Sequence, residues 1–176
     1  MANLTAKSHV TLLPHLNSLQ KNAILLANIA GKNKYFSLNL DSITAKNYLQ
    51  LAEIAETIAF FEEIFLIKKI AQELFNLHLE GTIIVFGSYA KKTFQQHSDL
   101  DIFYIGPLHD KEILNIKNIG KIYGKIIRIK KTTLRNFESG LRKKDPLLME
   151  IIKNHIILQN PEPFINGLWR FYCEKR

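Results

Sequence analysis

Cysteine is nearly absent from this chain of 176 residues, in which Cys173 is the only one. A single thiol cannot form a disulfide within the chain, and it cannot build a structural zinc site. The sequence therefore excludes a small disulfide-stapled scaffold, and it favours a reducing, cytoplasmic compartment.

Long apolar runs are also missing. None approaches the roughly 20 residues that an α-helix needs to cross a bilayer. The most apolar stretch, Ile64–Ile67, is preceded by two glutamates and followed by two lysines. We therefore expect no membrane partner.

Acidic residues are scarce relative to basic ones, with 16 Asp and Glu against 24 Lys and Arg and a net charge of +8. Residues 111–145 contain eleven Lys or Arg and three acids, so this segment accounts for the whole net charge. A basic block of this kind binds nucleic acid, nucleotide phosphates or an acidic partner surface. It is equally compatible with a solvated face that binds nothing.

What the sequence does contain is ordinary for a globular protein, since 47% of its residues are apolar and 23% are charged. Its length permits one domain, or one domain with a small appendage. The spacing of apolar residues predicts a helix within 1–22, a β-hairpin over 23–40 and one long helix over 43–79. From residue 82 onward strands alternate with helices. We expect strands at 82–86, 100–105, 121–131 and 156–158, and helices at 110–119, 133–144, 147–155 and 161–172.

Three parts follow from this pattern: an N-terminal segment over 1–41, a connecting helix over 42–80 and a domain over 81–176. The connecting helix has a wide apolar stripe made of Leu51, Ile54, Ala55, Ile58, Phe61, Phe65 and Leu66. A stripe of this width predicts either a helix in the core, which we favour, or a helix that packs against a second copy in a homodimer.

The segment Gly81–Gly106, GTIIVFGSYAKKTFQQHSDLDIFYIG, contains the candidate chemistry. A strand leads into Gly87 and Ser88, and the next strand begins near Asp99 and Asp101. Alternation along a strand puts the two carboxylates on one face. Paired carboxylates suit a hard cation such as Mg²⁺, and a Gly-Ser turn lets the backbone approach a phosphate closely. The competing interpretation is that Asp99 only caps a turn.

This segment resembles the signature of the DNA polymerase β-like nucleotidyltransferase superfamily, which has a Gly-Ser turn followed by Asp-x-Asp on the next strand. It is similar to the small, minimal nucleotidyltransferases of archaea and bacteria, which read Gly-Ser-x-Ala-(Arg/Lys)-Gly and then Ser-Asp-x-Asp. The matching residues are Gly87, Ser88, Ala90, Lys91, Ser98, Asp99 and Asp101. The resemblance implies the nucleotidyltransferase fold, an α/β (α+β) arrangement in which helices flank a small mixed sheet.

The resemblance also implies a chemistry. Mg²⁺ or Mn²⁺ ions held by Asp99 and Asp101 would position an NTP, expected to be ATP, for transfer of its nucleoside monophosphate to a protein or small-molecule hydroxyl. Gly87, Ser88 and Lys91 would bind the phosphates. Members of this family often act as antitoxins beside a HEPN-type toxin, in some cases by modifying it with AMP.

Two departures from the family pattern leave alternatives open. Lys92 stands where the family has a glycine, and the strand predicted over 121–131 lacks the third carboxylate that the family places there. Arg128 or Lys130 is expected to point to that place instead. The sequence is therefore compatible with a transferase, with a catalytically decayed nucleotide-binding or antitoxin module, or with a DNA-binding regulator.

The N-terminal run TAKSHVTLLPHLNSLQKNAILLANIAGKNKYFSLN resembles the second half of a winged helix-turn-helix. In that interpretation Lys7–Gln20 is the recognition helix and 23–40 is the wing. The residues expected to contact DNA are Ser8, His9, Thr11, Lys32 and Lys34. Pro14, and the lack of the helices that precede a recognition helix, leave open a repurposed winged helix that serves packing.

Overall fold

The fold is known from a computed structural model that describes residues 9–175. The chain divides into two compact units, residues 1–49 and residues 50–176. Helix α3 (Ile43–Glu63) begins in the first unit and continues into the second. No helix within the described range is long and apolar enough to span a bilayer.

The first unit contains a helix and a hairpin, as the sequence predicts. These are α2 (His9–Lys21), β1 (Leu25–Ala30) and β2 (Asn33–Leu38). The two strands are antiparallel, and their tight turn needs a left-handed residue, which Gly31 supplies with φ of 60°. Helix α2 continues through Pro14 and does not break there.

The second unit is built on a mixed four-stranded sheet with the order β5-β4-β3-β6. Its strands are β3 (Thr82–Phe86), β4 (Leu100–Ile105), β5 (Ile127–Thr132) and β6 (Ile156–Gln159). β3 is antiparallel to both of its neighbours, whereas β4 and β5 are parallel. This confirms the expected α+β class, a small mixed sheet flanked by helices.

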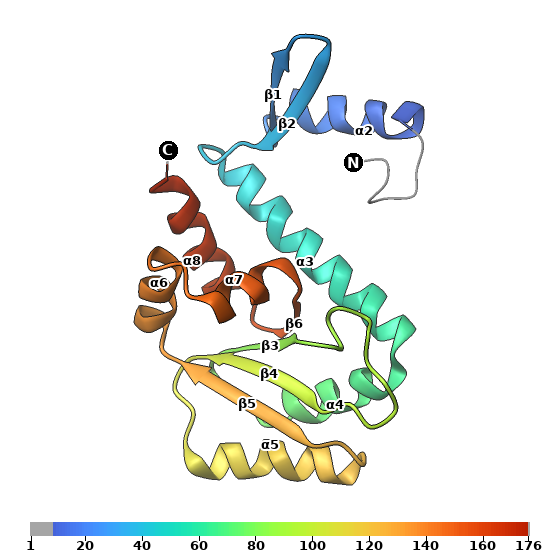
Figure 1. The fold of residues 1–176 in the computed structure, drawn as a ribbon, viewed down its shortest axis with the longest axis vertical. Helices are drawn as coiled ribbons and strands as arrows, with labels where there is room; N and C mark the ends of the chain where they lie inside the picture. The colour runs from blue at the N-terminus through green and yellow to red at the C-terminus, as the bar shows by residue number, and fades with distance from the viewer. Residues whose placement is uncertain (1–8, 176) are drawn as a thin grey trace. The chain divides into compact units, whose positions relative to one another are not determined.

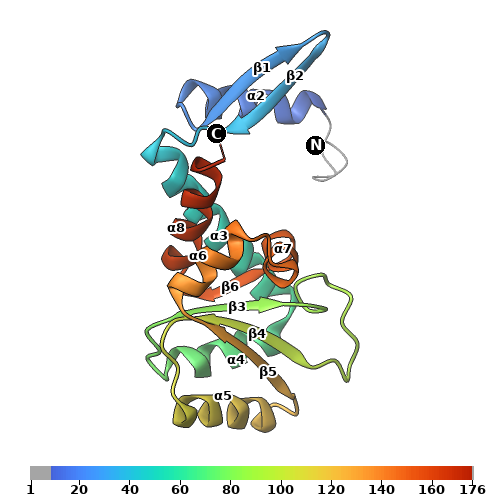
Figure 2. The same ribbon diagram turned by 60° about the vertical axis from the view of Figure 1, so that its left-hand side comes forward.

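Helices lie on both faces of this sheet (Figures 1 and 2). The helices of the second unit that follow α3 are α4 (Phe65–Phe75), α5 (Asp110–Ile122), α6 (Leu134–Arg142), α7 (Pro146–Lys153) and α8 (Glu162–Cys173). Side chains of α4 and α5 pack on one face and form a core with Ile83, Val85 and Ile102. On the other face Phe103 of β4 lies against Phe137 of α6.

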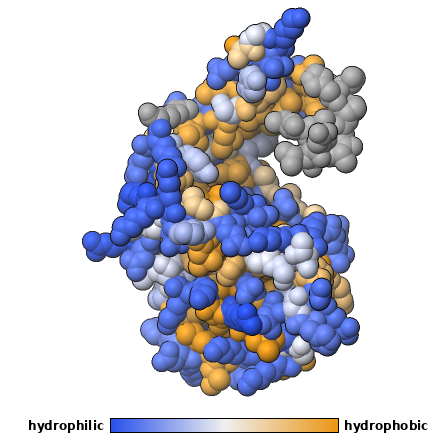
Figure 3. Space-filling model, viewed as in Figure 1, coloured by the Kyte–Doolittle hydropathy of each residue, from blue (hydrophilic) through white to orange (hydrophobic). Residues whose placement is uncertain are grey.

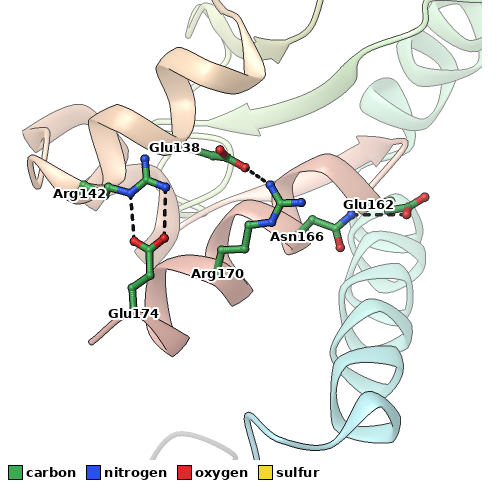
Figure 4. Close-up of polar contacts among 6 residues, drawn as sticks. All are labelled: Glu138, Arg142, Glu162, Asn166, Arg170 and Glu174. Atoms are coloured by element: carbon green, nitrogen blue, oxygen red, sulfur yellow. Dashed lines mark hydrogen bonds and ion pairs between the residues drawn. The ribbon is translucent and has the colours of Figure 1, made fainter. Parts of the chain in front are cut away.

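Helices α6 and α8 are tied together at their surface by two ion pairs, shown in Figure 4. Arg142 donates to Glu174 over 3.0 and 3.2 Å, and Arg170 donates to Glu138 over 2.7 Å. Glu138 is one of the few acids that follow the strand over 121–131. The carboxylate of Glu138 is therefore paired with Arg170 of α8.

The single helix predicted over 43–79 is wrong, because the structure has two helices there. α3 ends at Glu63, Ile64 adopts φ of −126° and ψ of 78°, and α4 begins at Phe65 and ends at Phe75. The change of direction lets α4 bury Ile67, Ile70 and Leu74 against the sheet. A straight helix would carry these residues away from it.

The apolar stripe of α3 is also not the core face that the sequence favours. Leu51, Ile54 and Ile58 are exposed by 59%, 45% and 55%, whereas Thr57 and Phe60 are buried. α3 therefore packs through the line that contains Thr57 and Phe60 and leaves Leu51, Ile54 and Ile58 exposed. Phe61 of the same stripe is partly buried against the core.

Candidate functional site

The candidate site begins where β3 ends. All five residues of β3 are buried, and the chain then turns at Gly87, whose φ is 71°. A Cβ at Gly87 would lie 2.5 Å from Oδ2 of Asp101, so this position needs glycine both for its backbone angle and for space. The turn continues as the Lys91 N–H donates to the Gly87 carbonyl over 3.0 Å.

Asp99 and Asp101 flank the start of β4 and share one face of it. Leu100 between them is fully buried on the opposite face, in the core formed with α4 and α5. Asp101 pairs in register with Phe86, the last residue of β3, which brings its carboxylate over the Gly87 turn. The structure therefore places Gly87, Asp99 and Asp101 together, and Ser88 follows Gly87 in the turn.

The electrostatics of the pair reflect partial burial and crowding of like charge. Burial raises the pKa of the Asp101 carboxyl, and the negative charges of Asp99 and Glu150 raise it further. Arg128 and Lys130 oppose this by lowering the same pKa. The site is thus a small acidic centre with two basic side chains beside it.

Arg128 contacts this centre directly. β5 runs parallel to β4 with Arg128 beside Asp101 in register, and the Arg128 guanidinium forms an ion pair with Oδ2 of Asp99. The Arg128 side chain is 68% exposed and that of Asp99 is 19% exposed. Of Arg128 and Lys130, the two basic residues of β5 expected near the site, Arg128 is the one that forms an ion pair with an aspartate of this centre.

Lys91 and Lys92 point in different directions from the turn. Lys91 forms an ion pair with Glu150 of α7 over 2.5 Å. Lys92 forms one with Glu63 over 2.6 Å, and its φ of 57° is the left-handed angle that a glycine adopts easily. The backbone at Lys92 thus keeps a glycine-like geometry although the side chain departs from the family pattern.

Glu150 is a further acid near the site that sequence reasoning does not assign to it. It lies on α7, far along the chain from β4, yet its charge acts on Asp101 and its carboxylate holds Lys91. No local pattern signals this, because only the packing of α7 over the sheet brings Glu150 to the site.

The family of nucleotidyltransferase domains matches residues 66–158, which is more than half of the chain. The match includes the turn, both aspartates, strands β3, β4 and β5, and all of β6 except its last residue. The chain belongs to this family. No curated protein matches the chain.

A nucleotidyltransferase domain acts on a nucleoside triphosphate and typically uses a divalent metal. Asp99 and Asp101 fit one hard cation, since Mg²⁺ is commonly held by one or two carboxylates together with substrate phosphates. They do not form a three-carboxylate site. Within residues 9–175 no three acidic, His or Cys residues gather closely enough to hold a metal ion.

The residues predicted to contact DNA belong to the first unit, which the family match at residues 66–158 does not include. Ser8 falls outside the described residues. His9 begins α2, and Thr11 is exposed on the same helix. Lys32 is at the hairpin turn, whereas Lys34 donates to Asn17 of α2 over 3.2 Å.

Proposed function

We propose that the second unit is a metal-dependent nucleotidyltransferase that moves a nucleoside monophosphate from an NTP, expected to be ATP, to a hydroxyl of a protein or small molecule. The observation that supports this proposal is the pair of carboxylates, Asp99 and Asp101, on one face at the start of β4, with that of Asp101 directly over the Gly87 turn. This is the arrangement that an acidic cation site beside a phosphate-binding turn requires.

The roles of the residues follow from their chemistry. Asp99 and Asp101 would hold Mg²⁺ or Mn²⁺, which neutralises phosphate charge when it is bound. Ser88 offers a hydroxyl and an N–H to phosphate oxygens, and Gly87 keeps the backbone open to their approach. Arg128, exposed and held by Asp99, presents a guanidinium that matches a phosphate in shape and charge.

The proposed transfer forms one bond to phosphorus and breaks another. The acceptor oxygen bonds to the α-phosphorus, the bond from that phosphorus to the bridging oxygen breaks, and pyrophosphate leaves. The proton of the acceptor hydroxyl passes to water. The domain contributes position and charge rather than a covalent intermediate.

A label-transfer assay tests this function. The protein is incubated with α-labelled ATP, and then with the other nucleotides, in the presence of Mg²⁺ or Mn²⁺ and an extract of its source cells. We expect label on an acceptor, lost in the variant with Asp99→Ala and Asp101→Ala. Asp110→Ala, which removes an exposed carboxylate at the start of α5, is the matched control and keeps the activity.

Absence of label with every nucleotide and metal, from protein shown to be folded by its thermal transition, would contradict the transferase. The second candidate would then apply: a catalytically decayed nucleotide-binding or antitoxin module. The ion pair between Arg128 and Asp99 favours it, because a cation at this place competes with a metal. Calorimetry would show ATP binding that does not require Mg²⁺ and that weakens in Arg128→Ala.

Two protein partners are also proposed, a toxin and a second copy of this chain. The family resemblance supports an antitoxin role beside a HEPN-type toxin in the cytoplasm. The exposed apolar stripe of α3, which includes Leu51, Ile54 and Ile58, supports a homodimer through that helix.

DNA binding by the first unit also remains a proposal, supported by the order of helix and hairpin in a winged-helix-like segment. Fluorescence anisotropy with duplex DNA tests it. Binding that prefers one sequence and weakens in the variant with Thr11→Ala and Lys32→Ala supports a DNA-reading role. Binding that weakens with salt but shows no preference for one sequence contradicts a DNA-reading role, because the general positive charge of the protein explains it.

A further inference from the structure

The sheet of the second unit has two edges, formed by β6 and β5. At the β6 edge the Thr57 hydroxyl of α3 donates to the Ile157 carbonyl over 2.9 Å. β5 forms the other edge, and within residues 9–175 no strand pairs with its outer side. An open edge of this kind is a template for another strand.

The direction of the β5 backbone groups can be read from its ladder. The Leu100 N–H donates to the Ile126 carbonyl and the Gly106 N–H to the Thr132 carbonyl, each over 2.9 Å. Even-numbered residues of β5 therefore bond to β4. In a parallel ladder the odd-numbered residues then turn their N–H and C=O groups outward. These are Ile127, Ile129 and Lys131.

A basic groove of about 680 Å³ runs beside this edge, between β5 and α5. Its floor is aliphatic, and its rim is basic; Figure 3 shows apolar surface among hydrophilic residues over these two elements. The lining residues are Ile113, Lys117, Lys121, Lys125, Ile126 and every residue of β5 from Ile127 to Lys131. Lys117 and Lys121 have no ion-pair partner among the described residues.

We propose that this groove, the β5–α5 groove, binds an extended acidic segment of a partner protein, which adds to the sheet as a strand beside β5. The outward N–H and C=O groups bond to the backbone of that segment. Its alternate side chains reach the groove, where apolar ones rest on Ile113 and Ile129 and acidic ones pair with Lys117 and Lys121. The proposal does not depend on nucleotidyl transfer.

Other occupants fit the groove less well. A second copy of this chain would bring two basic edges together, and like charges would repel. Single-stranded nucleic acid would use the basic rim, but none of the lining residues is an aromatic on which bases stack. Nucleic acid would also leave the outward backbone groups of β5 without the ladder partners that a peptide supplies.

Fluorescence anisotropy with a labelled peptide of about eight residues tests the proposal. Its odd-numbered positions, which share one face of a strand, alternate between Val and Glu, and its even-numbered positions are Thr. We expect binding that weakens about five- to tenfold when Lys117→Glu and Lys121→Glu are combined. The matched control combines Lys68→Glu and Lys153→Glu, which change the net charge equally at exposed positions outside the groove. Equal weakening in both variants, or a Kd above about 1 mM, would overturn the proposal.

Backbone readouts separate a strand from a loosely attracted polyanion. Amide exchange is expected to slow on peptide binding at Ile129 and Lys131, whose N–H groups point outward, and to stay unchanged at the neighbouring Lys130. Ile129→Pro removes an outward N–H without touching the β4 ladder, and it should weaken peptide binding while the fold is retained. If an oligothymidine binds more tightly than the peptide and Ile129→Pro leaves both unaffected, the groove is a nucleic-acid site and the proposal fails.

Discussion

At the scale of single residues, Arg128 sets the character of the site. It stands beside Asp101 in register and pairs with Asp99, where a third carboxylate would complete a metal site. Replacing Arg128 by an acid removes the repulsion between the guanidinium and a bound metal ion, and it adds an attraction between a carboxylate and that ion. Even at the effective dielectric constant of a protein surface, each change is worth about 2 kcal/mol or more at short range.

We therefore predict that Arg128→Asp raises the affinity for Mn²⁺ at least about tenfold. Titration followed by electron paramagnetic resonance measures it directly. Arg135→Asp, which makes the same change of charge at an exposed position on α6, is the control and should alter the affinity little. An equal rise in both variants would mean that only net charge matters.

Lys92 carries a backbone cost. Its φ of 57° is unfavourable for a residue with a Cβ, and its exposed ion pair with Glu63 offsets little of that cost. We predict that Lys92→Gly raises the free energy of unfolding by about 0.5–1 kcal/mol in urea titrations. Lys92→Ala loses the ion pair and keeps the strained angle, so it should give no gain. A gain with alanine as large as with glycine would refute the argument from φ.

The Tyr104 hydroxyl forms a buried polar contact at the sheet. It accepts a hydrogen bond from the Gly81 N–H over 2.8 Å in the core. Tyr104→Phe leaves that N–H without a partner and should lower the free energy of unfolding by about 1–3 kcal/mol at neutral pH.

The same hydroxyl gives a pH dependence. Burial raises the pKa of Tyr104 above its ordinary value of 10.0, so the folded state holds this proton more tightly than the unfolded state does. The corresponding stability is complete below pH 10 and is lost as the pH rises through the folded pKa. Urea titrations from pH 8 to 12 should show a smaller alkaline loss in Tyr104→Phe than in the parent; an identical loss would contradict this.

At the scale of elements, the strands and the caps were predictable because their signals are local. Asp145 caps α7 by accepting from the Leu148 N–H, and Thr133 caps α6 through Asn136, as their positions before the helices indicate. The break at Ile64 was not predictable, since no glycine or proline marks it. It arises because the sheet needs α4 in another direction, which is a tertiary demand.

The start of β5 was misplaced for a related reason. Residues 121–126 have the apolar spacing of a strand, but α5 continues to Ile122 and a turn through Gly124, with φ of 66°, follows it. In the candidate site, Gly87, Ser88, Asp99 and Asp101 could be proposed from the sequence because one local motif contains them. Glu150 could not be, because only the packing of α7 places it there.

Thr57 shows how α3 is fixed to the sheet edge. Its hydroxyl donates to the Ile157 carbonyl of β6 and lies within hydrogen-bond distance of the Glu53 carbonyl. We predict that Thr57→Val, which keeps the shape, lowers the free energy of unfolding by about 1–2 kcal/mol because the Ile157 carbonyl loses this donor. Thr44→Val at an exposed position of α3 is the matched control. A similar loss in both would point to helix propensity instead.

At the scale of the whole molecule, charge and apolar surface are unevenly distributed. The basic residues concentrate along α5, β5 and α6, whereas the exposed apolar stripe lies on α3. Composition revealed the first asymmetry. It could not reveal the second, since whether an apolar stripe is buried depends on which face of the helix meets the sheet.

The stripe leads to a prediction about assembly. If α3 mediates a homodimer, combining Ile54→Lys and Ile58→Lys should convert the dimer to a monomer in light-scattering measurements. The stability of the monomer should change by no more than about 1 kcal/mol, because both side chains are about half exposed. Phe60→Ala, on the buried line of the same helix, should instead cost about 3–5 kcal/mol. If the parent protein is monomeric at all concentrations measured, the homodimer proposal is wrong.

The turn at Gly87 has a consequence for how such a domain changes over generations. One small volume is shared by the bare Cα of Gly87 and the carboxylate of Asp101, so a side chain at the first position displaces the second. Substitutions at these two positions are therefore epistatic: loss of the acid at 101 removes the steric conflict of an alanine at 87, which then keeps only the cost of its left-handed backbone angle. A lineage that abandons the site is free to lose both, and one that still depends on it can lose neither. The joint fate of these two residues among descendants would thus record whether selection still acts on the chemistry.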